Sequence, residues 1–92
     1  MPRYLIETNH TSEHEGCVRA LHAIVVHGSH LITQSEWGCE DGVHRSWLIA
    51  ETDSREEAML LVPPAHRASA RVVKLRTWSR DEIEEMMREL ES

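Results

Sequence analysis

The order of the hydrophobic patterns constrains the fold of this chain more than any other feature. Short runs rich in apolar and β-branched residues alternate with stretches whose apolar residues recur at helical spacing. The runs typical of strands span residues 3–9, 30–37, 43–52 and 71–78. Apolar residues recur at helical spacing in residues 12–27, in the segment between Ser54 and Pro63, and in residues 79–91. The predicted order is therefore strand, helix, strand, strand, helix, strand, helix.

Capping and breaking signals support the predicted helix boundaries. Ser12 and Ser79 are each followed three residues later by a glutamate, which is the spacing of a capping box. Gly28 lies where a C-terminal cap glycine belongs. The Asp53-Ser54 pair supplies a cap for the second helix, and Pro63-Pro64 is expected to end it because proline lacks the N–H group.

Two strand–helix–strand units joined by a hairpin usually fold into one particular sheet arrangement. They form a four-stranded antiparallel sheet in the strand order 4-1-3-2, with both helices on one face, because crossover connections are right-handed. We therefore predict an α+β, ferredoxin-like fold that places residues 1–92 in a single domain. Helix 79–91 is expected to be a C-terminal extension of that domain.

The composition predicts a small core and a partner chain. The sequence has 92 residues and no phenylalanine, so aliphatic residues, methionine and three tryptophans must fill the core. Chains of this size bury a modest fraction of their surface and are marginally stable. Burial against a second copy would add stability, so we expect a homodimer.

The charge distribution argues against a nucleic-acid partner. The net charge is -6, the acidic residues are concentrated at 81–91, and the lysines and arginines are scattered singly. A duplex-binding module would show a basic stripe instead. The apolar runs are too short to span a membrane, and the first residues show no signal-like segment. We expect a cytoplasmic protein with reduced cysteines that binds a small ligand and neither nucleic acid nor membrane.

The predicted topology gathers histidines and cysteines at one end of the sheet, called the His/Cys end below. This end collects the end of the first strand, the start of the first helix, the hairpin tip and the connection into the fourth strand. It contains His10, His14, Cys17, Cys39, His44 and His66. Imidazole nitrogen and thiolate sulfur are ligands for zinc and also suit nickel. We predict a zinc or nickel site with His10, Cys39 and His44 as ligands and either His14 or Cys17 as the fourth.

Other roles for the side chains at this end stay open. Trp37 precedes the hairpin tip and is expected to shield a bound metal or small ligand. Cys17 shares a helix face with Leu21, so it also fits a small core residue. His14 also fits a solvated residue of the first helical turn. If Cys17 and Cys39 come within reach of each other, they also fit a reversible disulfide pair.

The third predicted strand has two faces of different character. The side expected to face the helices carries His44, Ser46, Leu48 and Ala50. The other side carries Val43, Arg45, Trp47, Ile49 and Glu51. An open face with these apolar side chains needs cover. We expect either a second copy or helix 79–91 to pack on it.

The element order, the stretch from Trp37 to His44 and the run Val62-Pro63-Pro64 carry a family resemblance. With them the chain resembles small domains of the dimeric α/β-barrel group, in an uncharacterised ferredoxin-like family. This family is distantly similar to muconolactone-isomerase-like proteins, cofactor-independent monooxygenases and nickel-binding small domains. The resemblance covers nearly the whole chain. It implies a homodimer with a site between the helices and the sheet, and it carries over no catalytic residue.

Three functions follow from these observations. The first is a non-enzymatic homodimeric domain that binds a transition metal or small ligand at the His/Cys end. The alternative is an enzyme of the cofactor-independent monooxygenase or isomerase kind, with His44 or His10 as a general base. Such an enzyme needs an enclosed apolar cavity between the helices and the sheet. The third is a pure interaction module.

Overall fold

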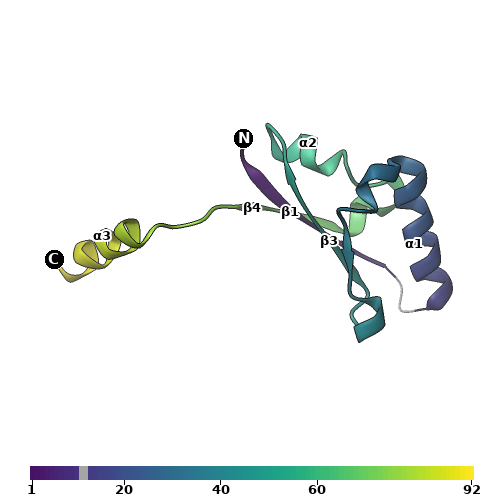
Figure 1. Cartoon of the computed structure of the whole chain (residues 1–92), viewed down its shortest axis with the longest axis horizontal. Coiled ribbons are helices and arrows are strands. Elements are labelled where there is room, and N and C mark those ends of the chain that lie inside the picture. Colours follow the sequence, from purple (N-terminus) through teal and green to yellow (C-terminus); the bar gives the residue numbers. More distant parts are fainter. Residues whose placement is uncertain (11–12) are drawn as a thin grey trace.

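The structure of the protein is a computed structural model that describes residues 1–10 and 13–92, apart from the side chains of His14 and Ser29. The described residues form four strands, three α-helices and short 3-10 turns, and Figure 1 shows how they are arranged. The strands are β1 (Arg3–Asn9), β2 (Glu36–Trp37), β3 (Arg45–Glu51) and β4 (Ala70–Leu75). The helices are α1 (His14–His27), α2 (Arg55–Met59) and α3 (Arg80–Glu91). The 3-10 turns are η1 (Ser29–Leu31), η2 (Cys39–Asp41) and η3 (Pro64–Ser69).

The four strands form one antiparallel sheet in the order β2-β3-β1-β4, so the fold class is α+β. Counted from the β4 edge, this is the sequence of neighbours 4-1-3-2. β1 is central, and its pairing with β3 runs from Arg3 opposite Glu51 to Asn9 opposite Arg45. The β2 edge strand is only two residues long. Because a full-length edge strand is missing there, the ferredoxin-like description remains a prediction.

The predicted strand over residues 30–37 is wrong for most of its length. Only Glu36–Trp37 pairs with β3, and the segment before it turns back on itself through η1. The carbonyl oxygen of Leu31 accepts hydrogen bonds from the backbone N–H groups of Gln34 and Ser35 at 3.1 and 3.0 Å. The turn buries the Leu31 side chain, which is 5% exposed, in the core. Core packing of one leucine therefore overrides the strand propensity of its neighbours.

The core lies on one face of the sheet, beneath α1 and α2. Its buried residues are Tyr4, Ile6, Leu31, Leu48, Ala58, Val62 and Val72. The predicted alternation of β3 is confirmed, since Ser46 and Leu48 are buried whereas Ile49 on the other side is 54% exposed. Ile24 of α1 also packs against this core. The sheet thus has a covered inner face and an open outer face.

The helix boundaries confirm some capping signals and correct others. The Ser54 side chain accepts a hydrogen bond from the N–H of Glu57, so it caps α2 as predicted, although α2 ends at Met59. Ser79 and Glu82 form the predicted capping box of α3. α1 begins after Glu13, which makes no side-chain cap bond. Residue 12, the predicted cap, lies outside the described residues.

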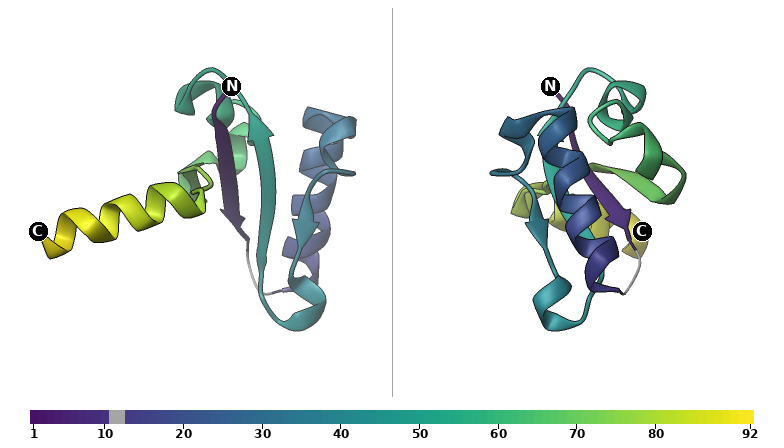
Figure 2. Two further views of the ribbon diagram at one scale, coloured as in Figure 1. Left: turned by 60° about the vertical axis from the view of Figure 1, so that its left-hand side comes forward. Right: turned by 90° about the vertical axis from the view of Figure 1, so that its right-hand side faces the viewer.

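α3 extends away from the rest of the chain (Figure 1). In the left view of Figure 2 it leaves on the side of the sheet opposite α1. β4 ends at Leu75 rather than at residue 78 as predicted, and an extended segment leads from it into α3. No helix among the described residues is both long and apolar enough to cross a membrane.

Candidate metal centre

The sheet brings His10 and His44 together. His10 follows the last residue of β1, and His44 precedes the first residue of β3, so the two face each other where the ladder ends. The backbone N–H of His10 donates to the carbonyl oxygen of His44 at 3.1 Å. Their ring centroids lie 5.6 Å apart in an edge-to-face arrangement. The predicted adjacency of the first and third strands is confirmed, and it places these two histidines side by side.

Two glycines shape the hairpin tip that carries Cys39. The carbonyl oxygen of Gly38 accepts hydrogen bonds from the N–H groups of Asp41 and Val43, both at 3.0 Å. A Cβ atom at Gly38 would lie 2.8 Å from the Val43 carbonyl oxygen, which leaves no room for a larger residue. Gly42 closes the turn with φ 80, in the left-handed region that favours glycine. The tip is therefore a tight 3-10 turn that begins at Cys39.

The Cys39 sulfur lies at the meeting point of three segments. It is 3.0 Å from Nε2 of His10, at the end of β1. It is 2.7 Å from the sulfur of Cys17, in α1, which donates its S–H toward it. Both cysteines are free and half-buried. The helix, the sheet and the hairpin tip thus converge on one thiol.

His10, Cys39 and His44 have the spacing of a metal site. One ligand atom from each of the three lies within 4.8 Å of the other two, and all three side chains are half-buried. Nitrogen and sulfur ligands on one tetrahedral zinc ion are separated by roughly 3.3–3.7 Å, from their bond lengths to the metal. Small side-chain movements would bring the three atoms onto a common ion.

The pKa values of His10 and Cys39 are shifted in opposite directions. Burial lowers the pKa of His10, and the neighbouring His44 and His66 lower it further, so the neutral imidazole that can bind a metal is favoured. Nδ1 of His44 is buried and has no hydrogen-bond partner among the described residues. Burial, followed by the hydrogen bond with Cys17, raises the pKa of Cys39 to about 11. Without a metal the Cys39 thiol is therefore protonated, and a bound cation would favour the thiolate.

An open pocket of about 670 Å³ gives access to this cluster from solvent. It lies between the start of α1 and the hairpin tip and is lined by Cys17, Cys39 and His44 among others. The hollow between α1, the inner sheet face and Pro63 has a volume of only about 10 Å³. That is close to the room needed by one water molecule. The enclosed cavity that the enzyme alternative needs is not found in this hollow.

The other predicted site residues are placed as follows. The Trp37 ring lies 5.7 Å from the His10 ring, tilted by 52°, so the indole covers one side of that imidazole. Cys17, on α1, contacts Cys39 directly. The side chain of His14 lies outside the described part of the structure. The predicted metal set is thus brought together except for His14, on which the structure gives no information.

His66 belongs to this neighbourhood, as the predicted topology indicates, although it is not among the predicted ligands. It comes from η3 and lines a shallow pocket together with His10. It is also close enough to lower the pKa of His10. Its position in the connection into β4 is the signal that places it at the His/Cys end.

Comparisons with known proteins do not identify the chain: no family model matches it, and no curated protein or solved structure shows a significant match. The resemblance to small dimeric α/β-barrel domains therefore remains a prediction.

Proposed function

We propose that this protein binds a transition-metal ion, zinc or nickel, at the His/Cys end through His10, Cys39 and His44, with Cys17 as the fourth ligand. The observation that carries the proposal is the convergence of three ligand atoms within 4.8 Å in half-buried surroundings. Two imidazoles and two thiolates make a Cys2His2 set, the donor combination of many tetrahedral zinc sites.

The unpartnered nitrogen of His44 supports metal binding over a purely structural role. A buried polar atom without a hydrogen bond costs roughly 1–3 kcal/mol. Nδ1 of His44 has no hydrogen-bond partner among the described residues, and His44 belongs to the cluster with His10 and Cys39. A metal ion bound through Nδ1 would give this nitrogen a partner, whereas the hydrogen bonds of the cluster leave it without one.

Cys17 is favoured over His14 as the fourth ligand because its sulfur is already 2.7 Å from that of Cys39. Two sulfurs on one tetrahedral ion are roughly 3.7 Å apart, since each zinc–sulfur bond is about 2.3 Å. Binding therefore requires the two sulfurs to separate by about 1 Å. The open pocket between α1 and the tip leaves space for that movement. Two reduced thiols in contact fit a cytoplasmic protein.

Elemental analysis of protein purified without a histidine tag tests the proposal. We expect close to one zinc or nickel ion per chain and a rise in Tm when either ion is added to metal-free protein. Cobalt(II) titration adds a spectroscopic test, because thiolate ligation and tetrahedral geometry each give characteristic absorption.

Matched variants separate the site from nonspecific binding by histidine. His44→Ala should abolish stoichiometric binding, whereas His22→Ala, at an exposed position of α1, should leave it unchanged. Substoichiometric metal together with no thermal shift would refute the proposal. Equal effects of the two substitutions would refute the assigned ligand set.

A further inference from the structure

The contact between Cys17 and Cys39 has a consequence beyond metal binding. The two sulfurs come from α1 and from the hairpin tip, which are separated by 22 positions in the chain, yet they lie 2.7 Å apart. Both side chains line the pocket that opens to solvent. A small oxidant can therefore reach a pair of thiols that are already in contact.

We propose that Cys17 and Cys39 form a reversible disulfide in response to a hydroperoxide, and that this disulfide and the bound metal exclude each other. The metal half of this statement rests on the proposed function, whereas the disulfide does not. The reason for exclusion is that a Cys39 sulfur bonded to Cys17 no longer offers a thiolate to the ion. The cysteine pair is then a site of modification that controls occupancy of the metal site.

The reaction balances with hydrogen peroxide as the oxidant. One cysteine, as its thiolate, attacks a peroxide oxygen, the O–O bond breaks, and a sulfenic acid and water form. The sulfur of the other cysteine attacks the sulfenic sulfur, the S–S bond forms, and a second water leaves. Two thiols and one peroxide thus give one disulfide and two waters. From the metal-bound state, two protons are taken up and the divalent ion is released.

The observed sulfur separation lies between the two end states. A disulfide requires approach to roughly 2.05 Å, and a shared ion requires separation to roughly 3.7 Å. Cys17 sits on a helix and Cys39 on a turn, so a change in their separation leaves the β1–β3 ladder in place. Either state is therefore within reach of a local rearrangement at the His/Cys end.

Peroxide treatment of metal-free and zinc-loaded protein tests the inference. We expect the metal-free chain to lose both free thiols and two mass units without forming a covalent dimer, and dithiothreitol to restore both thiols. The zinc-loaded chain should release its zinc to a colorimetric chelator in step with thiol loss. Cys17→Ser should prevent the intramolecular disulfide while leaving Cys39 available for alkylation.

The outcomes separate this inference from the proposed function. A sulfinic acid on one cysteine with the other still free, or zinc retained by a disulfide-bonded chain, would overturn the inference alone. A disulfide formed in a protein that never takes up metal would overturn the proposed function and the exclusion, and leave the disulfide standing.

A second observation, independent of the His/Cys end, concerns α3. Its apolar residues Ile83, Met86, Met87 and Leu90 are between 40% and 80% exposed. They form one face of the helix, since they recur at three- and four-residue spacing. Figure 1 shows that α3 stands clear of the sheet. No described part of the same chain therefore covers its apolar face.

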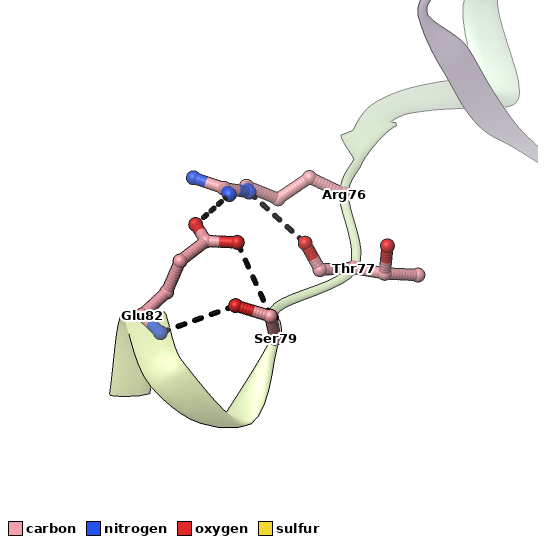
Figure 3. A network of polar contacts seen from close by, with 4 residues as sticks. All are labelled: Arg76, Thr77, Ser79 and Glu82. Carbon is pink, nitrogen blue, oxygen red and sulfur yellow. Dashed lines mark hydrogen bonds and ion pairs between the residues drawn. The ribbon is translucent and has the colours of Figure 1, made fainter. Parts of the chain in front are cut away.

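A polar network fixes how α3 leaves β4 (Figure 3). Ser79 and Glu82 form the capping box, and the Arg76 guanidinium pairs with the Glu82 carboxylate and donates to the Thr77 carbonyl oxygen. The Arg76 guanidinium also stacks 3.8 Å above the Trp78 ring. These contacts hold the connection in a conformation that directs α3 away from its own sheet.

The outer face of the sheet presents a matching apolar row. Ile49, Leu5 and Val73 lie side by side across β3, β1 and β4 in the ladder register. The side chain of Ile49 is 54% exposed. The left view of Figure 2 places this face on the side from which α3 departs. The same face carries three arginines, Arg3, Arg45 and Arg71, and three glutamates, Glu7, Glu36 and Glu51. α3 has six acidic residues against two arginines.

We infer that a second copy of the chain covers both surfaces, with α3 of each copy lying on the outer sheet face of the other. The connection directs α3 away from its own sheet, so a second copy is the occupant that this geometry favours. Arg3 and Arg71 on that face offer partners for acidic residues of α3. A helix of 12 residues is about 18 Å long, enough to cross three strands at about 4.8 Å spacing.

A charge-exchange experiment tests the reciprocal contact. Sedimentation of the native chain should show a dimer. Met87→Glu and Ile49→Lys, each alone, should give monomers with native circular dichroism. Mixing the two variants should restore a heterodimer, because one contact is native and the other pairs opposite charges. Val26→Glu, at a residue of α1 that is 73% exposed, is the control and should remain dimeric.

Several results would overturn the α3 contact. One such result is a native chain that stays monomeric at high concentration. A monomer in which α3 folds onto its own sheet would count as the same result. A dimer that survives Ile49→Lys but not Met87→Glu would point to helix–helix packing instead. A dimer unaffected by either substitution would place the interface elsewhere.

Discussion

The backbone N–H of His10 donates to the carbonyl oxygen of His44 at 3.1 Å, so the positions of the two imidazoles are set by the ladder that joins β1 to β3. A slip of one residue in this ladder would turn the side chains of one strand to the opposite face. The relative placement of the two histidines therefore depends on the core residues of β1 and β3 that hold the register. Cys39 meets this pair from a separate segment, and its position depends on the hairpin tip.

Gly38→Ala should weaken metal binding through the shape of that tip. The added Cβ would lie 2.8 Å from the Val43 carbonyl oxygen and 3.1 Å from the Trp47 ring, so the turn that carries Cys39 must shift. Forced overpacking of this kind costs about 1–3 kcal/mol. Urea unfolding should show this loss, and cobalt titration should show reduced affinity. Gly42→Asn is the matched control, because asparagine tolerates the left-handed region and the site is open. Equal affinities for the two variants would contradict the prediction.

Metal affinity should rise with pH, with a slope that reports the number of thiols bound. The pKa of Cys39 is raised to about 11, so at neutral pH its proton must leave when a metal binds. Affinity should rise about tenfold per pH unit for each thiol that ligates. The pKa of His10 is lowered, so this imidazole is already neutral at neutral pH. It therefore does not contribute to the pH dependence of the metal affinity. Isothermal titration over a range of neutral and alkaline pH measures this dependence.

Cys17→Ser is the comparison for the pH slope. If Cys17 is a ligand, its replacement should reduce the slope by one proton as well as weaken binding. An unchanged slope would show that the Cys17 thiol is not deprotonated by the metal and would favour another fourth ligand.

Acid should reduce the helicity of α3. The hydrogen bond from the backbone of Ser79, then that from its side chain and the contact with Arg76, lower the pKa of Glu82. A carboxyl whose folded pKa is lowered stabilises the folded form above its ordinary pKa, and this stabilisation is lost as pH falls through the folded value. Far-ultraviolet circular dichroism during acid titration should show loss of helix in that range. Glu82→Gln should remove this transition, whereas Glu89→Gln should keep it.

Leu31→Ala should destabilise the fold far more than Leu60→Ala. Leu31 is 5% exposed in the core, and truncation of a buried leucine costs about 2–5 kcal/mol. Leu60 is 59% exposed, so the same truncation there should cost little. Urea unfolding monitored by tryptophan fluorescence measures both. Similar costs at the two positions would mean that η1 does not anchor the core as described.

Local sequence signals predicted the elements whose formation depends mainly on residues close together in the chain. β1 occupies the predicted residues because the run from Tyr4 to Thr8 is rich in residues that favour strands, and its burial alternates with Tyr4 and Ile6 buried. α3 begins at its capping box because Ser79 and Glu82 satisfy each other's backbone groups without help from the rest of the chain. The segment around Leu31 could not be predicted in this way. Its neighbours favour a strand, but burial of the leucine side chain in the core selects a turn.

The sequence by itself determined the order of elements, the two faces of β3 and the gathering of histidine and cysteine at one end of the sheet, because these depend on periodicity and chain direction. Only the tertiary structure decided that the Cys39 sulfur lies 3.0 Å from His10 and 2.7 Å from Cys17. It also decided that α3 leaves the outer side of the sheet uncovered (Figure 2). Such contacts join residues far apart in the chain, and their distances depend on how the helix, the sheet and the turn pack together.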